Sequence, residues 1–213
     1  MTVSNMARAY EFYTEVLGGT EVLRDGDFQG AAIQNTLMQV NENDARMSGV
    51  NPLSAGVPDL RGGDQRLDVV FIQFDNVVIE LLQYRDAQQM PWTEGTFAAP
   101  RRETSPAFPT SMHISFDVDP EADFDAFIRD LELASASRGM TNVRCNRNTD
   151  APDDRARADA ALESYALEIS EGASDGWALA YCKGPEGEQL EFNQVRAPID
   201  ALFGNALAGR AAN

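Results

Sequence analysis

The chain has 213 residues, of which 43% are hydrophobic and 24% charged, so it is long enough for one large domain or two small modules with a buried core. Its formal net charge of −17 argues against nucleic acid or an anionic membrane surface as a partner. No apolar run approaches the length of a membrane span, and the N-terminus lacks the layout of a signal peptide, so we expect a cytoplasmic protein.

Residues 1–85 predict a first module. Apolar residues at helical spacing from Met6 to Leu17 predict a helix that ends at two glycines. Residues 41–66 are rich in Asn, Gly, Pro and Asp and predict a loop. The expected strands are residues 20–24, 33–40, 67–74 and 77–84, of which the last two form a hairpin.

Residues 86–111 carry several prolines and predict a linker, and residues 112–195 predict a second module. It opens with a strand at 112–118, followed by a helix that Asp119-Pro120 would begin. Residues 149–159 predict a surface insertion, and 196–213 a C-terminal tail with a short helix at 199–207 and a fraying end. The remaining expected strands are 142–146, 165–169, 177–183 and 189–195.

The two cysteines, Cys145 and Cys182, lie in unrelated contexts without the spacing of a metal-binding or redox motif. We therefore expect buried free thiols rather than a disulfide or a zinc pair.

A short pattern occurs twice, once at the end of each module. Ile79-Glu80-Leu81-Leu82-Gln83 and Leu190-Glu191-Phe192-Asn193-Gln194 both read aliphatic, Glu, apolar, any residue, Gln. The repetition indicates a duplicated strand that carries one carboxylate per copy. In a strand that is apolar on both faces, such as the one around Glu80, a carboxylate is costly unless it is paired or binds a metal. The competing interpretation is a pair of edge-strand glutamates that face water.

His113 is the only histidine in the chain. Strand alternation places it with Ser115 and Asp117, opposite the apolar face that the following helix would cover. A lone histidine on a strand is commonly a satisfied structural residue. Its place beside two matched glutamates favours a ligand role instead.

These features resemble the vicinal oxygen chelate superfamily, which includes glyoxalase I, extradiol dioxygenases and bleomycin resistance proteins. The resemblance rests on Ala9–Tyr13 with Leu17-Gly18, on Val78–Tyr84, on His113, and on Gly184–Gly187 with Leu190–Phe192. It spans roughly residues 3 to 195, apart from the loops and the insertion. It implies an α+β fold of paired βαβββ modules, here with a first module that lacks its opening strand.

The resemblance also implies a divalent metal ion (Zn, Ni, Mn, Fe or Co) held by Glu80, His113 and Glu191. The family's remaining ligand would fall a few residues before Met1. Three interpretations stay open: a shortened start, a site of three protein ligands with water, or a degenerate site.

The branch of the family follows from the histidine count. Extradiol dioxygenases use two histidines and a carboxylate, which this chain with its single His113 cannot supply. The resemblance then implies a glyoxalase-like lyase or isomerase (epimerase), in which the ion stabilises an enediolate. The catalytic base of such an enzyme would be Glu191, with Glu80 as the second choice. The substrate would be a small 2-oxo compound or its thiol adduct.

The alternative is a bleomycin-resistance-type protein that binds a small molecule without a metal. A fosfomycin-type thiol transferase ranks lower because we find no basic cluster suited to a phosphonate. We expect a homodimer; the family forms its cleft within one chain or between two.

Overall fold

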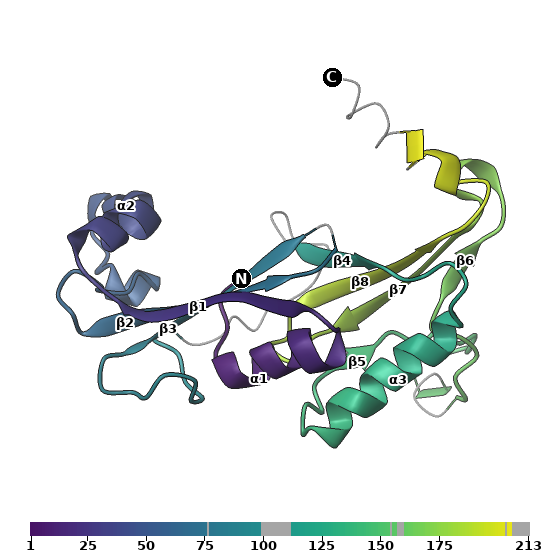
Figure 1. Cartoon of the computed structure of the whole chain (residues 1–213), viewed down its shortest axis with the longest axis horizontal. Coiled ribbons are helices and arrows are strands. Elements are labelled where there is room, and N and C mark those ends of the chain that lie inside the picture. Colours follow the sequence, from purple (N-terminus) through teal and green to yellow (C-terminus); the bar gives the residue numbers. More distant parts are fainter. Residues whose placement is uncertain (76, 99–111, 154, 157–159, 203, 206–213) are drawn as a thin grey trace. The chain divides into compact units, whose positions relative to one another are not determined.

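The computed structural model describes residues 1–75, 77–98, 112–153, 155–156, 160–202 and 204–205 (Figure 1). The chain divides into two compact units, Met1–Arg102 and Glu103–Asn213, and each is described here by itself. Parts of the expected linker, of the 149–159 insertion and of the C-terminal tail, including its expected fraying end, lie outside the described residues. No helix in the described part of the chain is long and apolar enough to span a membrane.

The first unit is built on a three-stranded antiparallel sheet with the order β1-β2-β3 (Figure 1). The expected hairpin is confirmed as β2 and β3, and the expected N-terminal helix is present, with a π-helical second half. The elements are α1 (Met6–Glu11) with the π-helical turn Phe12–Val16, β1 (Thr20–Phe28), α2 (Ala31–Met47), a 3₁₀ turn (Leu53–Ala55), β2 (Gln65–Gln73) and β3 (Val78–Asp86).

An isolated parallel bridge between Thr2 and Leu82 occupies the place of an opening strand. The Val3 amide donates to the Leu82 carbonyl and the Leu82 amide donates to the Met1 carbonyl, each at 2.9 Å. The spatial order is therefore N-terminal segment, β3, β2, β1. As expected, no full strand precedes α1.

The prediction of a strand at 33–40 followed by a loop at 41–66 was wrong, because this region contains α2. Ile33 and Met38 of α2 pack against a buried cluster that includes Leu67, Val69 and Tyr84 of the sheet. The β-branched and aliphatic residues of 33–40 favoured a strand locally, but in the helix only Ile33 and Met38 pack on the sheet, whereas Leu37 and Val40 are exposed. The strand expected at residues 20–24 is present but longer, since β1 continues to Phe28 with an irregular register against β2.

The second unit repeats the arrangement with the order β4-β8-β7-β5, and β6 pairs with β7 (Figure 1). β4 runs parallel to β8, whereas β7 is antiparallel to β8, β5 and β6. The expected strands are confirmed, with shorter bounds for β4, β5 and β6. The elements are β4 (His113–Asp117), α3 (Phe124–Ser137), β5 (Arg144–Cys145), β6 (Leu167–Ile169), β7 (Trp177–Lys183) and β8 (Gln189–Val195).

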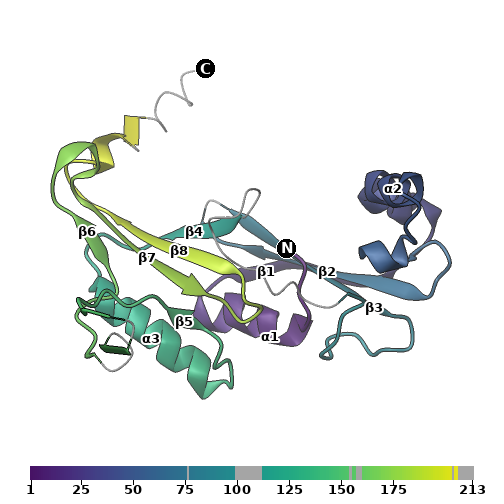
Figure 2. The ribbon, with the colours of Figure 1, turned by 180° about the vertical axis from the view of Figure 1, so that it is seen from behind.

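Helix α3 begins later than Asp119-Pro120, the start that the sequence predicted. Its N-cap is Asp123, whose carboxylate accepts a hydrogen bond from the Ala126 amide at 2.9 Å. Asp119 instead accepts from the Glu121 amide and shapes the turn before the helix. Figure 2 shows α3 along one side of the sheet, and Phe127 packs edge-to-face on Phe192 at 5.4 Å.

The two sheets share one strand order, which is the order expected of duplicated βαβββ units. Each unit also carries an insertion between its second and third strands. In the first unit the insertion contains α2, between β1 and β2; in the second it contains β6, between β5 and β7.

The glutamines of the repeated pattern have matching structural roles. Gln83 is fully buried and donates to the carbonyls of Ser4, Thr93 and Gly95. Gln194 is equally buried and donates to the carbonyls of Asp119 and Ala122 at 2.6 and 2.9 Å. Each therefore ties the last strand of its unit to the segment that leads into the unit's helix.

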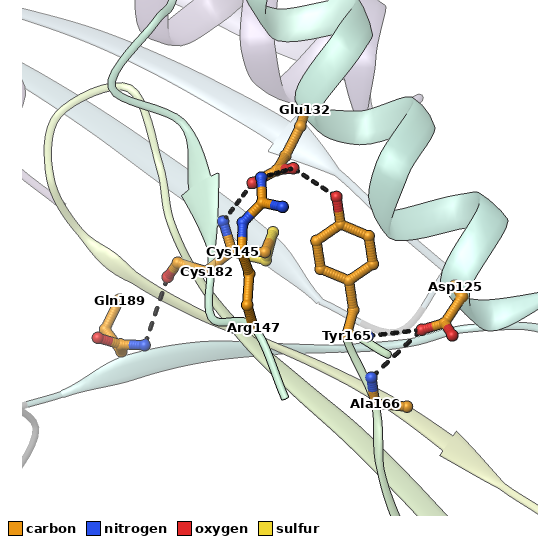
Figure 3. Close-up of a disulfide and its surroundings, with 8 residues drawn as sticks. All are labelled: Asp125, Glu132, Cys145, Arg147, Tyr165, Ala166, Cys182 and Gln189. Atoms are coloured by element: carbon orange, nitrogen blue, oxygen red, sulfur yellow. Dashed lines mark hydrogen bonds and ion pairs between the residues drawn. A yellow bond between two sulfur atoms is a disulfide. The ribbon is translucent and has the colours of Figure 1, made fainter. Parts of the chain in front are cut away.

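Cys145 and Cys182 form a disulfide between directly paired residues of β5 and β7, so the expectation of free thiols was wrong (Figure 3). The two residues are 37 positions apart in the sequence, and only the antiparallel register of these strands makes them neighbours. Glu132 of α3 supports this edge of the sheet, since it accepts hydrogen bonds from the Cys145 amide and the Tyr165 hydroxyl, both at 2.7 Å (Figure 3).

Candidate functional site

The candidate site lies on the face of the second sheet opposite α3. Because side chains alternate along a strand, Phe192 points toward α3 and Glu191 points to the other face. Strand register places Ser115 of β4 and Tyr181 of β7 on either side of Glu191. A row of three polar side chains therefore crosses the centre of the sheet.

His113 and Glu191 lie in contact on this face. The His113 Nε2 and Glu191 Oε2 atoms are 2.9 Å apart. The Glu191 side chain is only 10% exposed, whereas that of His113 is 40% exposed. The carboxylate is therefore largely withdrawn from water, and the imidazole lies between it and solvent.

Tyr181 completes the surroundings of this pair. Its ring lies edge-to-face against the His113 ring, with centroids 5.6 Å apart. Burial raises the pKa of the Tyr181 hydroxyl, and the charge of Glu191 and a hydrogen bond to that carboxylate raise it further. At neutral pH Tyr181 is thus a neutral donor held against the Glu191 carboxylate.

A second polar group lies next to this row. The Trp177 indole N–H donates to the Asn193 Oδ1 atom at 2.7 Å, and the Asn193 Nδ2 group donates to the Ser115 Oγ atom at 2.6 Å. Asn193 is 6% exposed, so both ends of its amide are used in a buried setting.

Glu80 lies in the first unit, on β3, and is exposed. Val78 beside it is 47% exposed, so the face of β3 that carries Glu80 is open at the strand's N-terminal end, as in the competing interpretation of glutamates that face water. The Met1 ammonium donates to the Glu80 carbonyl. Burial lowers the pKa of this ammonium, and the Glu80 charge offsets part of the effect.

The donors of the His113–Glu191 pair suit a divalent ion. Imidazole nitrogen and carboxylate oxygen are both ligands of Zn and of the neighbouring transition metals, and these two lie close enough to bind one ion. Among the residues that the structure describes, no cluster of three or more His, Cys, Asp or Glu side chains could hold a metal. The pair fits part of a metal site, and a further protein ligand would have to complete it.

Sequence reasoning singled out His113 and Glu191 but missed Tyr181, Asn193 and Trp177. Their signal was the period of two in β7 and β8, which places Trp177 and Tyr181 on one face of β7 and Glu191 and Asn193 on one face of β8. What alternation could not provide was the register between the strands.

No family model matches the sequence, and no curated protein matches it. Solved structures do match. A glyoxalase family protein from Bacillus cereus has 14% identity and a TM-score of 0.46, covering 91% of this chain and 88% of its own. A glyoxalase/dioxygenase from Nostoc punctiforme has 14% identity and a TM-score of 0.42, covering 92% and 87%.

A third match is a glyoxylase/bleomycin resistance protein/dioxygenase domain from Frankia, with 14% identity, a TM-score of 0.41 and 92% coverage of both chains. At these identities and scores the matches do not bear on activity. The repeated strand order does bear on the architecture. The chain therefore has the α+β fold of two βαβββ units, the first without a full opening strand, that its resemblance to the vicinal oxygen chelate superfamily implies.

Proposed function

We propose that the protein is a metal-dependent, glyoxalase-like lyase or isomerase that removes a proton next to a carbonyl group of a small 2-oxo compound or its thiol adduct. The observation that carries the proposal is the largely buried Glu191 carboxylate in contact with His113 on a polar sheet face. A carboxylate kept from water but supplied with hydrogen-bonding partners is a suitable general base.

In this proposal His113 and Glu191 hold a divalent ion with Glu80 as the third protein ligand. The ion would polarise the substrate's carbonyl oxygen and so acidify the adjacent C–H bond. Glu191 has two carboxylate oxygens, so it can bind with one and accept the proton with the other. Tyr181, paired with Glu191 in the strand register, would donate a hydrogen bond to this carboxylate, and the imidazole of His113 would limit the access of water to it.

The test measures metal content and proton abstraction separately. The purified protein is analysed for bound Zn, Ni, Mn, Fe and Co, and then incubated in D₂O with methylglyoxal, pyruvate and the glutathione adduct of methylglyoxal. We expect stoichiometric metal and deuterium incorporation next to the carbonyl, seen by NMR. Glu191→Gln should lose both. Glu168→Gln, an exposed glutamate on β6 of the same sheet, is the matched control and should lose neither.

A metal-free protein that keeps its fold and binds these compounds without exchange would instead establish the non-catalytic binding role. A protein with full metal content but no exchange would overturn the proposed reaction while leaving the metal site intact.

The contribution of Glu80 and the expected homodimer can be tested together. Glu80→Gln and Glu191→Gln variants are unfolded, mixed and refolded, and their metal content is compared with that of each variant alone. If the site forms between two copies, mixed dimers contain one intact site and regain metal. If it forms within one chain, mixing restores nothing, and sedimentation gives the number of chains in either case.

A further inference from the structure

The hydrogen bonds that link Trp177, Asn193 and Ser115 run in one fixed direction. An indole N–H can only donate, so the Asn193 atom that faces Trp177 must be the carbonyl oxygen. The amide nitrogen of Asn193 therefore faces Ser115, at 2.6 Å from the Ser115 Oγ atom. An amide NH₂ group cannot accept, so Ser115 is the acceptor in this contact.

The direction of this chain determines what remains available at its end. Since Ser115 accepts from Asn193, its own hydroxyl proton must point elsewhere. Among the described residues none accepts a hydrogen bond from the Ser115 hydroxyl. Ser115 is exposed on β4 and is directly paired with Glu191 in the strand register. A free donor therefore lies beside the buried carboxylate.

We propose that Ser115 is a ligand-positioning residue: its hydroxyl, oriented by Asn193 and Trp177, donates a hydrogen bond to an oxygen of a small 2-oxo carboxylate bound next to Glu191. This inference rests on the proposed function for the location of the ligand, but it does not require a metal or a reaction. The donor offsets the repulsion that Glu191 exerts on an oxygen-rich ligand.

The chain contains two tryptophans, so Trp177 can report on binding directly. Trp92 belongs to the first unit, where the Arg24 guanidinium lies over its ring and Tyr10 packs against it edge-to-face. In a Trp92→Phe background the remaining emission comes from Trp177, whose N–H is the first donor of the chain. Pyruvate, glyoxylate and oxalate are titrated against this signal, with and without added Zn²⁺ or Mn²⁺.

Ser115→Ala removes the donor, and we expect the affinity for the compound that binds most tightly to fall about tenfold. Ser115→Thr keeps a hydroxyl on a β-branched residue suited to a strand and should retain binding within about threefold. Melting temperatures are recorded for each variant, so that loss of binding is compared only among folded proteins.

Asn193→Asp tests the direction of the chain. The new carboxylate can still accept from Trp177, but it accepts from Ser115 as well, which turns the Ser115 proton away from the ligand. We expect it to weaken binding about as much as Ser115→Ala, and the double variant to be no weaker than Ser115→Ala alone. A purely structural role for Ser115 would not produce this non-additivity.

Unchanged affinity in a folded Ser115→Ala variant would overturn the inference, and so would the absence of binding by all three compounds to the parent protein. The outcome is separable from that of the proposed function. Ser115-dependent binding in a metal-free, exchange-inactive protein would support the inference and refute the reaction. Deuterium exchange that survives Ser115→Ala, with unchanged affinity, would support the reaction and refute the inference about Ser115.

Discussion

At the scale of single residues, the two polar positions of the repeated pattern differ in how well their surroundings match between the units. Gln83 and Gln194 have the same role in both units, because each ties the last strand to the segment before the helix. Glu80 and Glu191 do not share surroundings: Glu80 is exposed on β3, whereas Glu191 is largely buried and contacts His113. The glutamines thus preserve the fold of the repeat, and the glutamates have diverged in environment.

The raised pKa of Tyr181 gives a test of its contact with Glu191. In the difference between the ultraviolet titrations of the parent protein and Tyr181→Phe, the Tyr181 hydroxyl should ionise above the ordinary value of 10.0. Glu191→Gln should move this midpoint down, because it removes the charge that raises the pKa, while the burial effect remains.

The effect on stability has a definite sign. A tyrosine whose pKa is raised by folding contributes stability that is fully present below about pH 10 and is lost as the pH rises through the folded value. Chemical unfolding at pH 9 and pH 11 should therefore show Tyr181→Phe losing less stability than the parent protein over this interval. In the ultraviolet titration, Glu168→Gln on the exposed strand β6 is the control and should leave the midpoint of Tyr181 ionisation unchanged. If Glu191→Gln also leaves this midpoint unchanged, the contact between Tyr181 and Glu191 is absent.

At the scale of elements, the insertion of the first unit packs on its sheet, whereas in the second unit the strand that leads into the insertion is itself fixed to the sheet. α2 packs through Ile33 and Met38 onto the apolar cluster of the first sheet. β5 has only two residues, and it is held by the disulfide between Cys145 and Cys182 and by Glu132 of α3. A strand this short contributes few ladder hydrogen bonds, so its covalent link to β7 fixes the start of the insertion that follows.

Removal of this disulfide should destabilise the protein. A link between residues 37 positions apart restricts the unfolded chain, and the loop-closure model gives about 4 kcal/mol for a loop of this size. Urea unfolding of the Cys145→Ser/Cys182→Ser double variant should show a loss of this order. Adding a reductant to the parent protein should reproduce most of the loss and should leave the double variant unaffected. Equal stability of both proteins in oxidising buffer would contradict the disulfide.

At the scale of the whole molecule, the property with the clearest consequence for stability is the large negative net charge. The net charge is −17, with 34 acidic against 17 basic residues, so repulsion among carboxylates opposes the compact state. Several ion pairs offset it locally. Buried Arg85 binds Asp68 and Asp27, and the guanidinium groups of Arg61 and Arg46 hold the pKa of Glu42 at about 2. These pairs involve few of the acidic residues.

The melting temperature should therefore rise with salt. Between about 0.1 and 1 M NaCl the screening length falls from about 10 to 3 Å, which removes most of the repulsion between exposed carboxylates. Differential scanning calorimetry should show an increase of several degrees. Neutralising three exposed acidic residues of the second unit, as in Asp150→Asn/Glu163→Gln/Glu171→Gln, should raise the melting temperature at low salt and reduce the salt dependence. A melting temperature that falls with salt would show that attractive pairs dominate instead.

The sequence by itself determined the features that depend on local periodicity. Alternation in residues 112–118, 177–183 and 189–195 predicted strands that the structure confirms, and it placed His113 and Glu191 on polar faces. The matched endings of the two modules predicted the duplication. These features follow from the period of a strand, which a sequence displays directly.

Only the tertiary structure decided the features that depend on which strands pair and in what register. It placed residues 33–40 in a helix, of which Ile33 and Met38 pack against the sheet while Leu37 and Val40 are exposed. It joined Cys145 to Cys182, and it aligned Trp177, Asn193 and Ser115 into a directed chain of hydrogen bonds. Contacts between residues this far apart in the chain leave no local pattern, because they are set by burial and strand pairing over the whole unit.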